Sequence, residues 1–376
     1  MKRFAILLVA LLAVPLIAQA PPPRWSASAL ADLHKWVAAA PEDALPAPDA
    51  AALEAAERVG DGAAVDQAAD SLALKLATMH LTGCCGANHR GWHIVDTDRT
   101  VGLPGQIAAA VSGGTLDAFF ASLTPRNPDY AALRAAYAGE KDPARRTTLA
   151  RNMERWRWLP QDPGGKYVLV NTAAFEVRYY AGGKLIDRRP VINGKVASPT
   201  PIFAARVTGI TFNPWWDLPP SIVREGIGAL AARNPAAARA KGYVWSGGRF
   251  RQRPGPTNSL GLMKLVMPNP FNIYLHDTPS KSLFAKPVRA FSHGCVRVSD
   301  ALGFAATLLG EDRAAVDARV ATGETTTVSL AAAMPVYIAY FTAGLDPNGQ
   351  VAFYPDIYAR DSAMGDMKDN KPFCAA

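Results

Sequence analysis

The hydrophobic period of the chain changes once, at Pro160. Before it, apolar residues recur every three or four positions among many alanines, which is typical of amphipathic helices. After it, short runs rich in Val and Tyr are separated by Gly182-Gly183 and Asn193-Gly194, which is typical of strands joined by tight turns. At 376 residues the chain is long enough for two domains. The sequence therefore predicts an α+β protein, with a helical scaffold domain over residues 24–158, a mainly β domain over residues 159–360 and a C-terminal tail over residues 361–376.

The two halves differ in the elements that we expect. Helical spacing covers residues 26–81, 106–139 and 143–158, with two helices in the second of these ranges. The later runs predict strands over 167–171, 175–180, 185–192, 206–212, 262–267, 272–275, 296–298, 325–330, 336–341 and 351–354. They also predict helices over 299–309, 313–322 and from Pro219 to about residue 233, the last with Ser221 as N-cap. Residues 234–258 read as a long connection, either part of a flap over about 214–258 or a surface loop without a role.

The first twenty residues are typical of a targeting segment. Lys2 and Arg3 precede an apolar stretch, and Ala18-Gln19-Ala20 matches an A-x-A cleavage site. Pro21 directly after that site hinders cleavage, so the segment is expected to be either a signal peptide or an N-terminal membrane anchor. Both alternatives predict export to the periplasm or cell envelope.

The charge of the chain narrows the class of partner. The formal net charge is +8, and removing Lys2 and Arg3 leaves +6. A mild basic excess suits an anionic cell-wall polymer or a membrane surface. No cluster of Lys and Arg carries a recognisable motif for reading bases, so no nucleic-acid partner is expected.

Two adjacent cysteines, Cys84 and Cys85, lie in a Gly-rich stretch with three histidines, residues 80–93. Such a group can bind a metal, but adjacent cysteines rarely ligate one zinc ion and no CxxC pair is present. We therefore expect no metal and no cofactor. Export favours a disulfide. If Cys295 stays free, Cys374 is the expected partner of Cys84 or Cys85 and the other of these two is left over; a vicinal pair of Cys84 and Cys85 is the alternative.

Side chains able to act in catalysis are concentrated in residues 290–298, where His293, Cys295 and an arginine lie within nine positions. A cysteine is a good nucleophile as a thiolate, which needs a base within reach and a third group to orient that base. His276 ends one expected strand and Cys295 begins another, so the two can face each other across a crevice. His293 lies two positions before Cys295. Side chains two positions apart on a strand share a face, but their ends need not come into contact. The residues favour His276 as the base. We expect His276 to make Cys295 ionise more easily than a free thiol. The alternative is that Cys295 is a small buried core residue without a catalytic role.

The spacing from His276 to Ser292-His293-Gly294-Cys295-Val296-Arg297 resembles the active-site signature of the L,D-transpeptidases, cysteine enzymes that cross-link bacterial peptidoglycan. The resemblance extends over residues 150–360 and is to the large, two-domain branch of that family. The half before Met153 matches only loosely. Further matching segments lie at residues 153–160, 213–220, 254–261, 275–279 and 356–358.

The resemblance implies roles for the catalytic residues. The family's catalytic histidine maps onto His276, and the backbone carbonyl that fixes its tautomer maps onto Asp277. We expect the N–H groups of Gly294 and Cys295, together with the Tyr274 hydroxyl, to stabilise the oxyanion.

Four further residues are expected to bind substrate. Arg297 can hold a substrate carboxylate in a fork or pair with an internal acid. Ser292 and His293 belong to the same loop, and His293 is expected to shape the pocket wall. Trp215 lines the approach to the site or belongs to the core.

The resemblance also implies a reaction. The donor is a tetrapeptide stem, cleaved between the L-centre of its third, diamino acid residue and the terminal D-Ala, with a thioester on Cys295. A second stem's amine resolves the thioester to give a 3→3 cross-link. Alternatives are an L,D-carboxypeptidase, a wall-to-protein transferase on the same site and an inactive wall-binding protein; a thiol oxidoreductase is disfavoured because Cys295 has no CxxC partner. The expected partners are stem peptides, and carbapenem-type inhibitors are expected to acylate Cys295.

Overall fold

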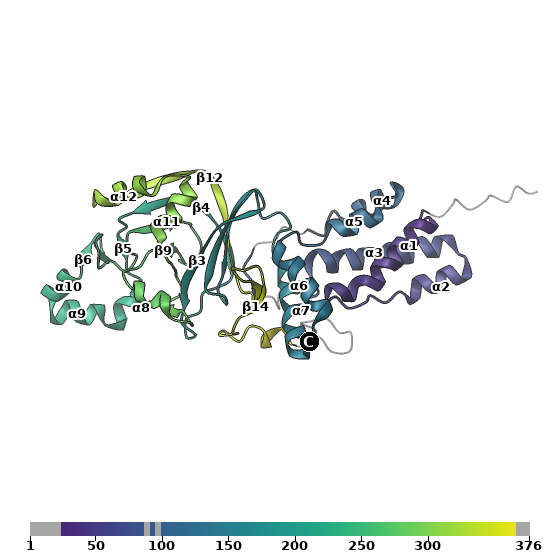
Figure 1. Cartoon of the computed structure of the whole chain (residues 1–376), viewed down its shortest axis with the longest axis horizontal. Coiled ribbons are helices and arrows are strands. Elements are labelled where there is room, and N and C mark those ends of the chain that lie inside the picture. Colours follow the sequence, from purple (N-terminus) through teal and green to yellow (C-terminus); the bar gives the residue numbers. More distant parts are fainter. Residues whose placement is uncertain (1–23, 86–90, 95–98, 366–376) are drawn as a thin grey trace, which may run out of the picture.

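The computed structural model describes residues 24–85, 91–94 and 99–365. The described part is elongated, with a bundle of helices at one end and a curved sheet at the other (Figure 1). The predicted α+β class, a helical N-terminal region followed by a mainly β domain, is confirmed. The expected targeting segment over residues 1–20 and the tail beyond residue 365 lie outside the described residues.

Capping side chains set where the helices begin. The Ser26 hydroxyl accepts from the Ala29 N–H, while Asn127 and Asp142 cap helices that start with a proline. Where the sequence predicted two helices over residues 106–139 there are three, beginning at Leu103, because Gly113 and Gly114 separate α4 from α5. The elements of this region are α1 (Ala27–Ala39), η1 (Ala40–Asp43), α2 (Ala51–Val59), α3 (Gly62–Thr82), α4 (Leu103–Ser112), α5 (Leu116–Ser122), α6 (Pro128–Gly139) and α7 (Pro143–Trp158).

The main sheet of the described chain has the strand order β10-β3-β11-β9-β8-β4-β12-β1-β2, and β3 also pairs with β2. The pairings therefore run in a closed circuit. One long strand, β12, replaces the two strands predicted over residues 325–341, with an irregularity between Ser329 and Met334. The strands are β1 (Lys166–Asn171), β2 (Glu176–Ala181), β3 (Lys184–Gly194), β4 (Phe203–Phe212), β8 (Met263–Val266), β9 (Leu275–His276), β10 (Ala290–Ser292), β11 (Val296–Val298) and β12 (Thr326–Ala339), with a separate pair, β13 (Ala343–Leu345) and β14 (Val351–Phe353).

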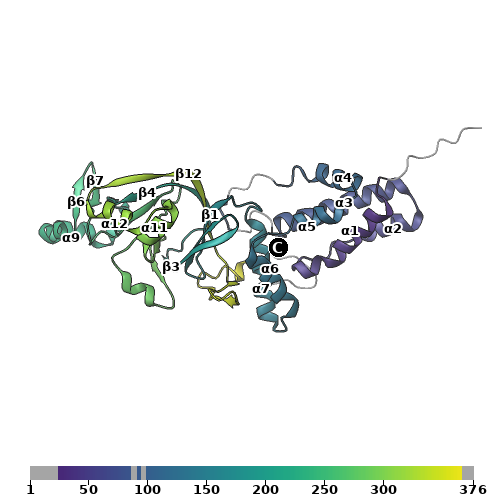
Figure 2. The same ribbon diagram turned by 45° about the horizontal axis from the view of Figure 1, so that its top comes forward.

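One face of this sheet is covered by helix α11 (Ala301–Leu309), which packs Phe304 and Ala305 against Leu275, Val296 and Val298. Helix α12 (Arg313–Ala321) follows it, and both helices lie beside β4 and β12 (Figure 2). Alternate residues of a strand point to opposite faces. The residues between these apolar ones on β8, β9 and β11 therefore point away from the core.

The helix predicted from Pro219 to about residue 233 is present as the run α8, η3 and α9, whereas residues 234–258, predicted as a long connection, hold α10, β6 and β7. Strands β5, β7 and β6 form a small sheet of their own, and α9, α10 and β6 lie at the end of the molecule far from the helical bundle (Figure 1). The prediction failed because a run of Ala, Gly, Arg and Pro has no clear period. Ser221 is not an N-cap, since the helix begins at Pro220 with Pro219 before it. The elements are β5 (Trp216–Asp217), α8 (Pro220–Ile222), the π-helical η3 (Val223–Ile227), α9 (Gly228–Arg233), α10 (Pro235–Ala240), β6 (Tyr243–Ser246) and β7 (Arg249–Gln252); short 3₁₀ turns η4 (Lys281–Ala285) and η5 (Ser362–Met364) complete the chain.

A shared apolar core joins the helical region to the β domain. Trp156 of α7 stacks on Phe341, with ring centroids 4.5 Å apart, and Tyr130, Leu149 and Met153 belong to the same cluster. The strands contribute residues to this cluster as well, so α7 packs on both parts of the molecule. Within the described ranges, no helix combines the length and the apolar character needed to cross a membrane.

A buried ion pair lies at the same junction. The Glu154 and Arg157 side chains are 0% exposed, with 3.4 Å between Nη1 and Oε2. Glu154 also accepts the backbone N–H groups of Cys84 and Cys85, at 2.7 and 2.9 Å, and the indole N–H of Trp158, at 3.1 Å. These contacts bind the end of α3 to α7.

Gly83 makes this close approach feasible. Its φ is +80°, and a Cβ at this position would stand 2.2 Å from Oε1 of Glu154. Only glycine adopts this backbone conformation freely and lets the chain pass so near the carboxylate. Arg157 is held from its other side by the Tyr130 hydroxyl, at 2.7 Å, and by the carbonyl of Asp43.

We predict that Glu154→Ala lowers the free energy of unfolding by about 3–5 kcal/mol, because it leaves the Arg157 charge buried and uncompensated. Urea unfolding followed by far-ultraviolet circular dichroism measures this loss. Asp317→Ala is the control, since it breaks the exposed pair that Arg313 makes with Asp317 at 2.8 Å and should change the midpoint little. Equal midpoints for the two variants would contradict a structural role for the buried pair.

Candidate active site

The parallel pairing of β9 with β11 builds the site. Val296 lies opposite Leu275 and Arg297 opposite His276. Directly opposed residues of neighbouring strands point to the same face. His276 and Arg297 therefore share the face that points away from the α11 core, and Cys295, two positions before Arg297, points the same way. His276 ends β9 as expected, and Cys295 directly precedes the neighbouring strand β11, but the register places Cys295 one row away from His276.

The Cys295 thiol is half-buried and does not contact the imidazole directly. Its Sγ donates to the carbonyl of Asn272, at 3.8 Å. Among the described residues no hydrogen bond joins Sγ to the His276 ring. Burial raises the pKa of the Cys295 thiol, and the Tyr274 N–H and the Arg297 and Lys264 charges only partly oppose that rise. The expectation that this thiol ionises more easily than a free one is therefore wrong for this arrangement, and its physical reason is loss of solvation.

His276 is buried and held in one orientation. Its Nδ1 lies 2.5 Å from the backbone carbonyl of Asp277, so Nδ1 carries the proton and Nε2 is left as the basic nitrogen. Burial above all, together with the Arg297 charge, lowers the pKa of His276 to about 4, and hydrogen bonds to the carbonyls of Asp277 and Leu260 only partly oppose that change. The imidazole is therefore neutral at physiological pH and can accept a proton.

Asp277 contributes to the site through its backbone, as expected, and through its side chain. One carboxylate oxygen accepts the Leu262 N–H at 2.9 Å, and the other pairs with Lys281. The side chain thus fixes the chain next to His276 and leaves no acid facing the thiol from this position.

The loop before Cys295 is held by its own hydroxyl group. Ser292 is buried; its Oγ accepts the Gly294 N–H at 3.1 Å and donates to the Cys295 carbonyl at 2.5 Å. Thr200, which sequence reasoning missed, donates to the Gly294 carbonyl at 2.8 Å. Gly294 has a φ of +113°, and a Cβ there would stand 2.9 Å from Ile273, so the turn requires glycine.

These bonds change the roles expected for two residues. The Gly294 N–H already has an acceptor in Ser292, so it is not free for an oxyanion, and the Ser292 hydroxyl is used within the loop rather than for substrate. Within the described chain the Cys295 N–H has no acceptor. Of the two expected N–H donors, only Cys295 is available. The Tyr274 hydroxyl likewise has no hydrogen-bond partner among the described residues, and its ring is half-buried beside the thiol.

Arg297 resolves an alternative that the sequence left open. No acid of the described chain pairs with its guanidinium, and Nε is buried without a hydrogen-bond partner. Burial lowers the pKa of Arg297, and the nearby Cys295 opposes that change. Within the described ranges an internal acid is therefore not its partner, which leaves the guanidinium available to an anion that enters the site.

The remaining two predicted residues lie further out. His293 is exposed, and its Nε2 lies 2.8 Å from a carboxylate oxygen of Glu225 in η3 and 3.3 Å from Nζ of Lys195. Trp215 is half-buried, with the Arg251 guanidinium 4.7 Å from its ring centroid. His293 thus joins the cysteine loop to the segment over residues 214–258 and does not face the thiol.

The other cysteines have separate states. Cys84 is free and Cys85 is disulfide-bonded. Cys374 lies outside the described residues, so its pairing stays a prediction. Burial raises the pKa of Cys84 to about 12, which makes it unreactive. In the ranges that the structure describes, no three His, Cys, Asp or Glu side chains gather as metal ligands; part of the stretch over residues 80–93 lies outside those ranges.

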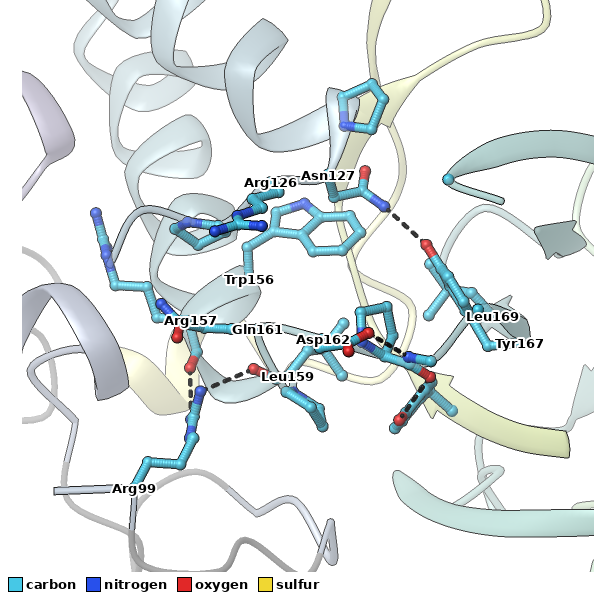
Figure 3. Close-up of a pocket in the computed structure, with 18 of the residues that line it drawn as sticks. Arg99, Arg126, Asn127, Trp156, Arg157, Leu159, Gln161, Asp162, Tyr167 and Leu169 are labelled. Atoms are coloured by element: carbon cyan, nitrogen blue, oxygen red, sulfur yellow. Dashed lines mark hydrogen bonds between the residues drawn. The ribbon is translucent and has the colours of Figure 1, made fainter. Parts of the chain in front are cut away.

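A cavity of about 410 Å³ opens at the junction of the helices and the sheet (Figure 3). Trp156 and Tyr167 line it, and Asn127 donates to the Tyr167 hydroxyl at 3.3 Å. Arg99 donates to the carbonyls of Arg157 and Leu159. None of the predicted site residues lines this cavity, so it is separate from the chemistry around Cys295.

We predict that the rate at which iodoacetamide alkylates Cys295 keeps rising as the pH increases past about 8.5, the pKa of an ordinary thiol. The reason is that the thiolate is the reacting form and burial raises the pKa of the Cys295 thiol. The rate at each pH is followed by mass spectrometry of the Cys295 peptide, with Cys84 as an internal control that should stay unmodified. Arg297→Gln should move the profile to still higher pH, since it removes a charge that favours the thiolate. An alkylation rate that already reaches its plateau at neutral pH would contradict the raised pKa of the Cys295 thiol.

Comparisons with known proteins fit this geometry. Residues 165–338 match the family model described as the L,D-transpeptidase catalytic domain (YkuD), and residues 18–136 match the model of a scaffold domain. A curated protein of Haemophilus influenzae, described as "Putative L,D-transpeptidase", is 31% identical over 237 residues. That match covers 57% of this chain and 48% of the relative, so the chain spans about half the length of that relative.

Solved structures are more distant. An L,D-transpeptidase from Mycobacterium smegmatis is 12% identical, with a TM-score of 0.27, and the match covers 46% of this chain and 58% of that one. L,D-transpeptidase 3 from Mycobacterium tuberculosis, in complex with a faropenem-derived adduct, is 14% identical, with a TM-score of 0.25 and coverage of 46% and 60%. The two family models confirm the resemblance drawn from residues 150–360: the chain contains an L,D-transpeptidase catalytic domain preceded by an N-terminal scaffold domain.

Proposed function

We propose that this protein is an L,D-transpeptidase of the cell envelope that forms 3→3 cross-links between peptidoglycan stems. The observation that carries the proposal is the parallel pairing of β9 with β11, which sets a buried neutral imidazole and a cysteine on one face. The matching catalytic-domain model supports the reaction class. The basic excess of the chain suits an anionic polymer and supports the location in the envelope.

In the proposed first step, Nε2 of His276 takes the proton of the Cys295 thiol and the thiolate attacks the carbonyl of the third stem residue. The Cys295 side chain first turns from the Asn272 carbonyl toward the imidazole, an adjustment common when catalytic hydrogen bonds tighten around a substrate. Arg297 favours the thiolate, because its charge lowers the pKa of Cys295. The oxyanion lies against the Cys295 N–H, with the Tyr274 hydroxyl as a second donor.

The second half of the reaction restores the enzyme. Protonated His276 gives its proton to the leaving D-Ala amine, and a thioester remains on Cys295. The side-chain amine of a second stem attacks the thioester, His276 accepts a proton from that amine, and the proton returns to the cysteine sulfur as it leaves. Water in place of the amine gives a tripeptide, and a protein amine gives a wall-linked protein.

Supply of disaccharide-tetrapeptides to the purified protein tests the proposal, with mass spectrometry of the products. We expect dimers that have lost one D-Ala. Tripeptide monomers alone would indicate an L,D-carboxypeptidase, and no release of D-Ala with a free Cys295 thiol would contradict an enzyme acting on this substrate. A carbapenem should add its mass to Cys295 and block the reaction, while Cys295→Ala should take up no inhibitor.

Variants of the two histidines test the assignment of the base. His276→Ala and Cys295→Ala should each lower the rate of D-Ala release on the order of 10³-fold or more, because base and nucleophile act as one unit. His293→Ala should lower it less than about tenfold, since that side chain is exposed and makes a surface ion pair with Glu225. Initial rates at saturating donor give these ratios. A larger loss in the His293 variant would exchange the roles of the two residues.

A further inference from the structure

We propose that Lys264 determines donor specificity, and that its ammonium group binds the carboxylate of the residue that follows the scissile bond. This inference deepens the proposed function and rests on it for the identity of the donor. It gives the site a means to select stems that end directly after the cleaved bond. Sequence reasoning did not single out Lys264, although it stands between the core residues Met263 and Leu265 at the alternation typical of a strand face.

The strand register places Lys264 on the catalytic face. Lys264 of β8 lies opposite His276 of β9, and His276 lies opposite Arg297 of β11. The three side chains therefore form one row on the same face of the sheet. Met263 and Leu265 point to the other face, where they are 0% exposed in the core. The neutral imidazole thus has a cation on each side.

Lys264 also lies close to the nucleophile. Its Nζ is 4.7 Å from the centroid of the Tyr274 ring, and Tyr274 stands beside Cys295, with its backbone N–H directed to the sulfur. Partial burial lowers the pKa of Lys264, and the nearby Cys295 and Asp217 oppose that change. The ammonium group is half-buried, so a bound substrate can reach it.

Among the residues that the structure describes, no acid forms an ion pair with this ammonium group. Lys264 forms no ion pair and its Nζ no hydrogen bond within the described chain. Asp217, which acts on it through charge, is already bound by Arg251 at 2.5 Å and Arg249 at 3.1 Å. Arg297, on the other side of His276, likewise has no acidic partner among the residues described. Two partly buried cations without counter-ions form a site that an anion would complete.

The anion could be the Cys295 thiolate or a group on the substrate. Arg297 has the larger effect on the pKa of Cys295, so the thiolate already has a cation beside it. A stem that ends at the residue after the scissile bond brings its free carboxylate next to the attacked carbonyl. Lys264 is a flexible point charge with three donors, which suits such a carboxylate. We therefore assign Lys264 to the substrate carboxylate.

The first arm of the test needs no peptidoglycan. Alkylation of Cys295 is measured with neutral iodoacetamide and with anionic iodoacetate, in the wild type, Lys264→Met, Lys264→Arg and Lys184→Met. Lys184 is an exposed lysine at the start of β3 and serves as the matched control. In Lys264→Met, the ratio of the iodoacetate rate to the iodoacetamide rate should fall about fivefold, the size expected for one partly screened charge pair. Lys264→Arg and Lys184→Met should keep the wild-type ratio.

An equal slowing of both reagents in Lys264→Met would overturn the proposal, because it would mean that Lys264 acts only on ionisation of the thiol. An unchanged ratio with unchanged rates would overturn it as well. The thermal midpoint of each variant and the recovery of the ratio in Lys264→Arg exclude a general loss of structure as the cause.

The second arm uses the donor. Disaccharide-tetrapeptides with a terminal carboxylate are compared with the same compounds carrying a terminal carboxamide. The wild type should show a lower KM for the carboxylate, and Lys264→Met should lose that preference with a smaller change in kcat. An equal preference for the carboxylate donor over the carboxamide donor in the wild type and in Lys264→Met would contradict the assignment of Lys264 to the substrate carboxylate. If the wild type releases no D-Ala from either donor, the proposed function fails, while the alkylation ratio still decides whether Lys264 binds an anion.

Discussion

The parallel pairing of β9 with β11 is the constraint on which the site depends. It brings together two segments that are separated in the chain by η4 and β10, and its register fixes which side chains share a row. A shift of one residue would turn His276 into the α11 core and expose Leu275. The apolar residues Leu275, Val296 and Val298 are fully buried, and their burial holds the register that presents His276 and Cys295 on the other face.

The protonation states of the groups around that pairing depend on two opposing effects, loss of solvation by burial and the charges of neighbouring side chains. Burial keeps both the thiol and the imidazole neutral, since it raises the pKa of Cys295 and lowers the pKa of His276 to about 4. Arg297 and Lys264 oppose the first effect, and no carboxylate of the described chain forms an ion pair with either of them. Under the proposed function, the missing counter-charge would arrive with the carboxylate of the donor, so binding of the donor would change the electrostatics of the site.

Much of the fold could be predicted because it follows from local rules. The helix of residues 143–158 was predicted with its exact bounds, since Asp142 caps it and Pro143 begins it. The strand of residues 296–298 was likewise correct. The small sheet of β5, β6 and β7 was not predicted, because its short strands carry no alternation of apolar and polar residues. The third helix between residues 103 and 139 was also missed, since two adjacent glycines read equally well as a loop.

The sequence by itself determined the two-part organisation, the helix starts and the candidates for nucleophile and base, because caps, period and motif spacing act over a few residues. The tertiary structure decided that His276 lies opposite Arg297 with Cys295 one row away, that Ser292 accepts the Gly294 N–H, and that Lys264 lies in the same row as His276. These outcomes depend on strands paired out of chain order and on burial that raises or lowers a pKa. Both arise from contacts between distant segments, which no local pattern encodes.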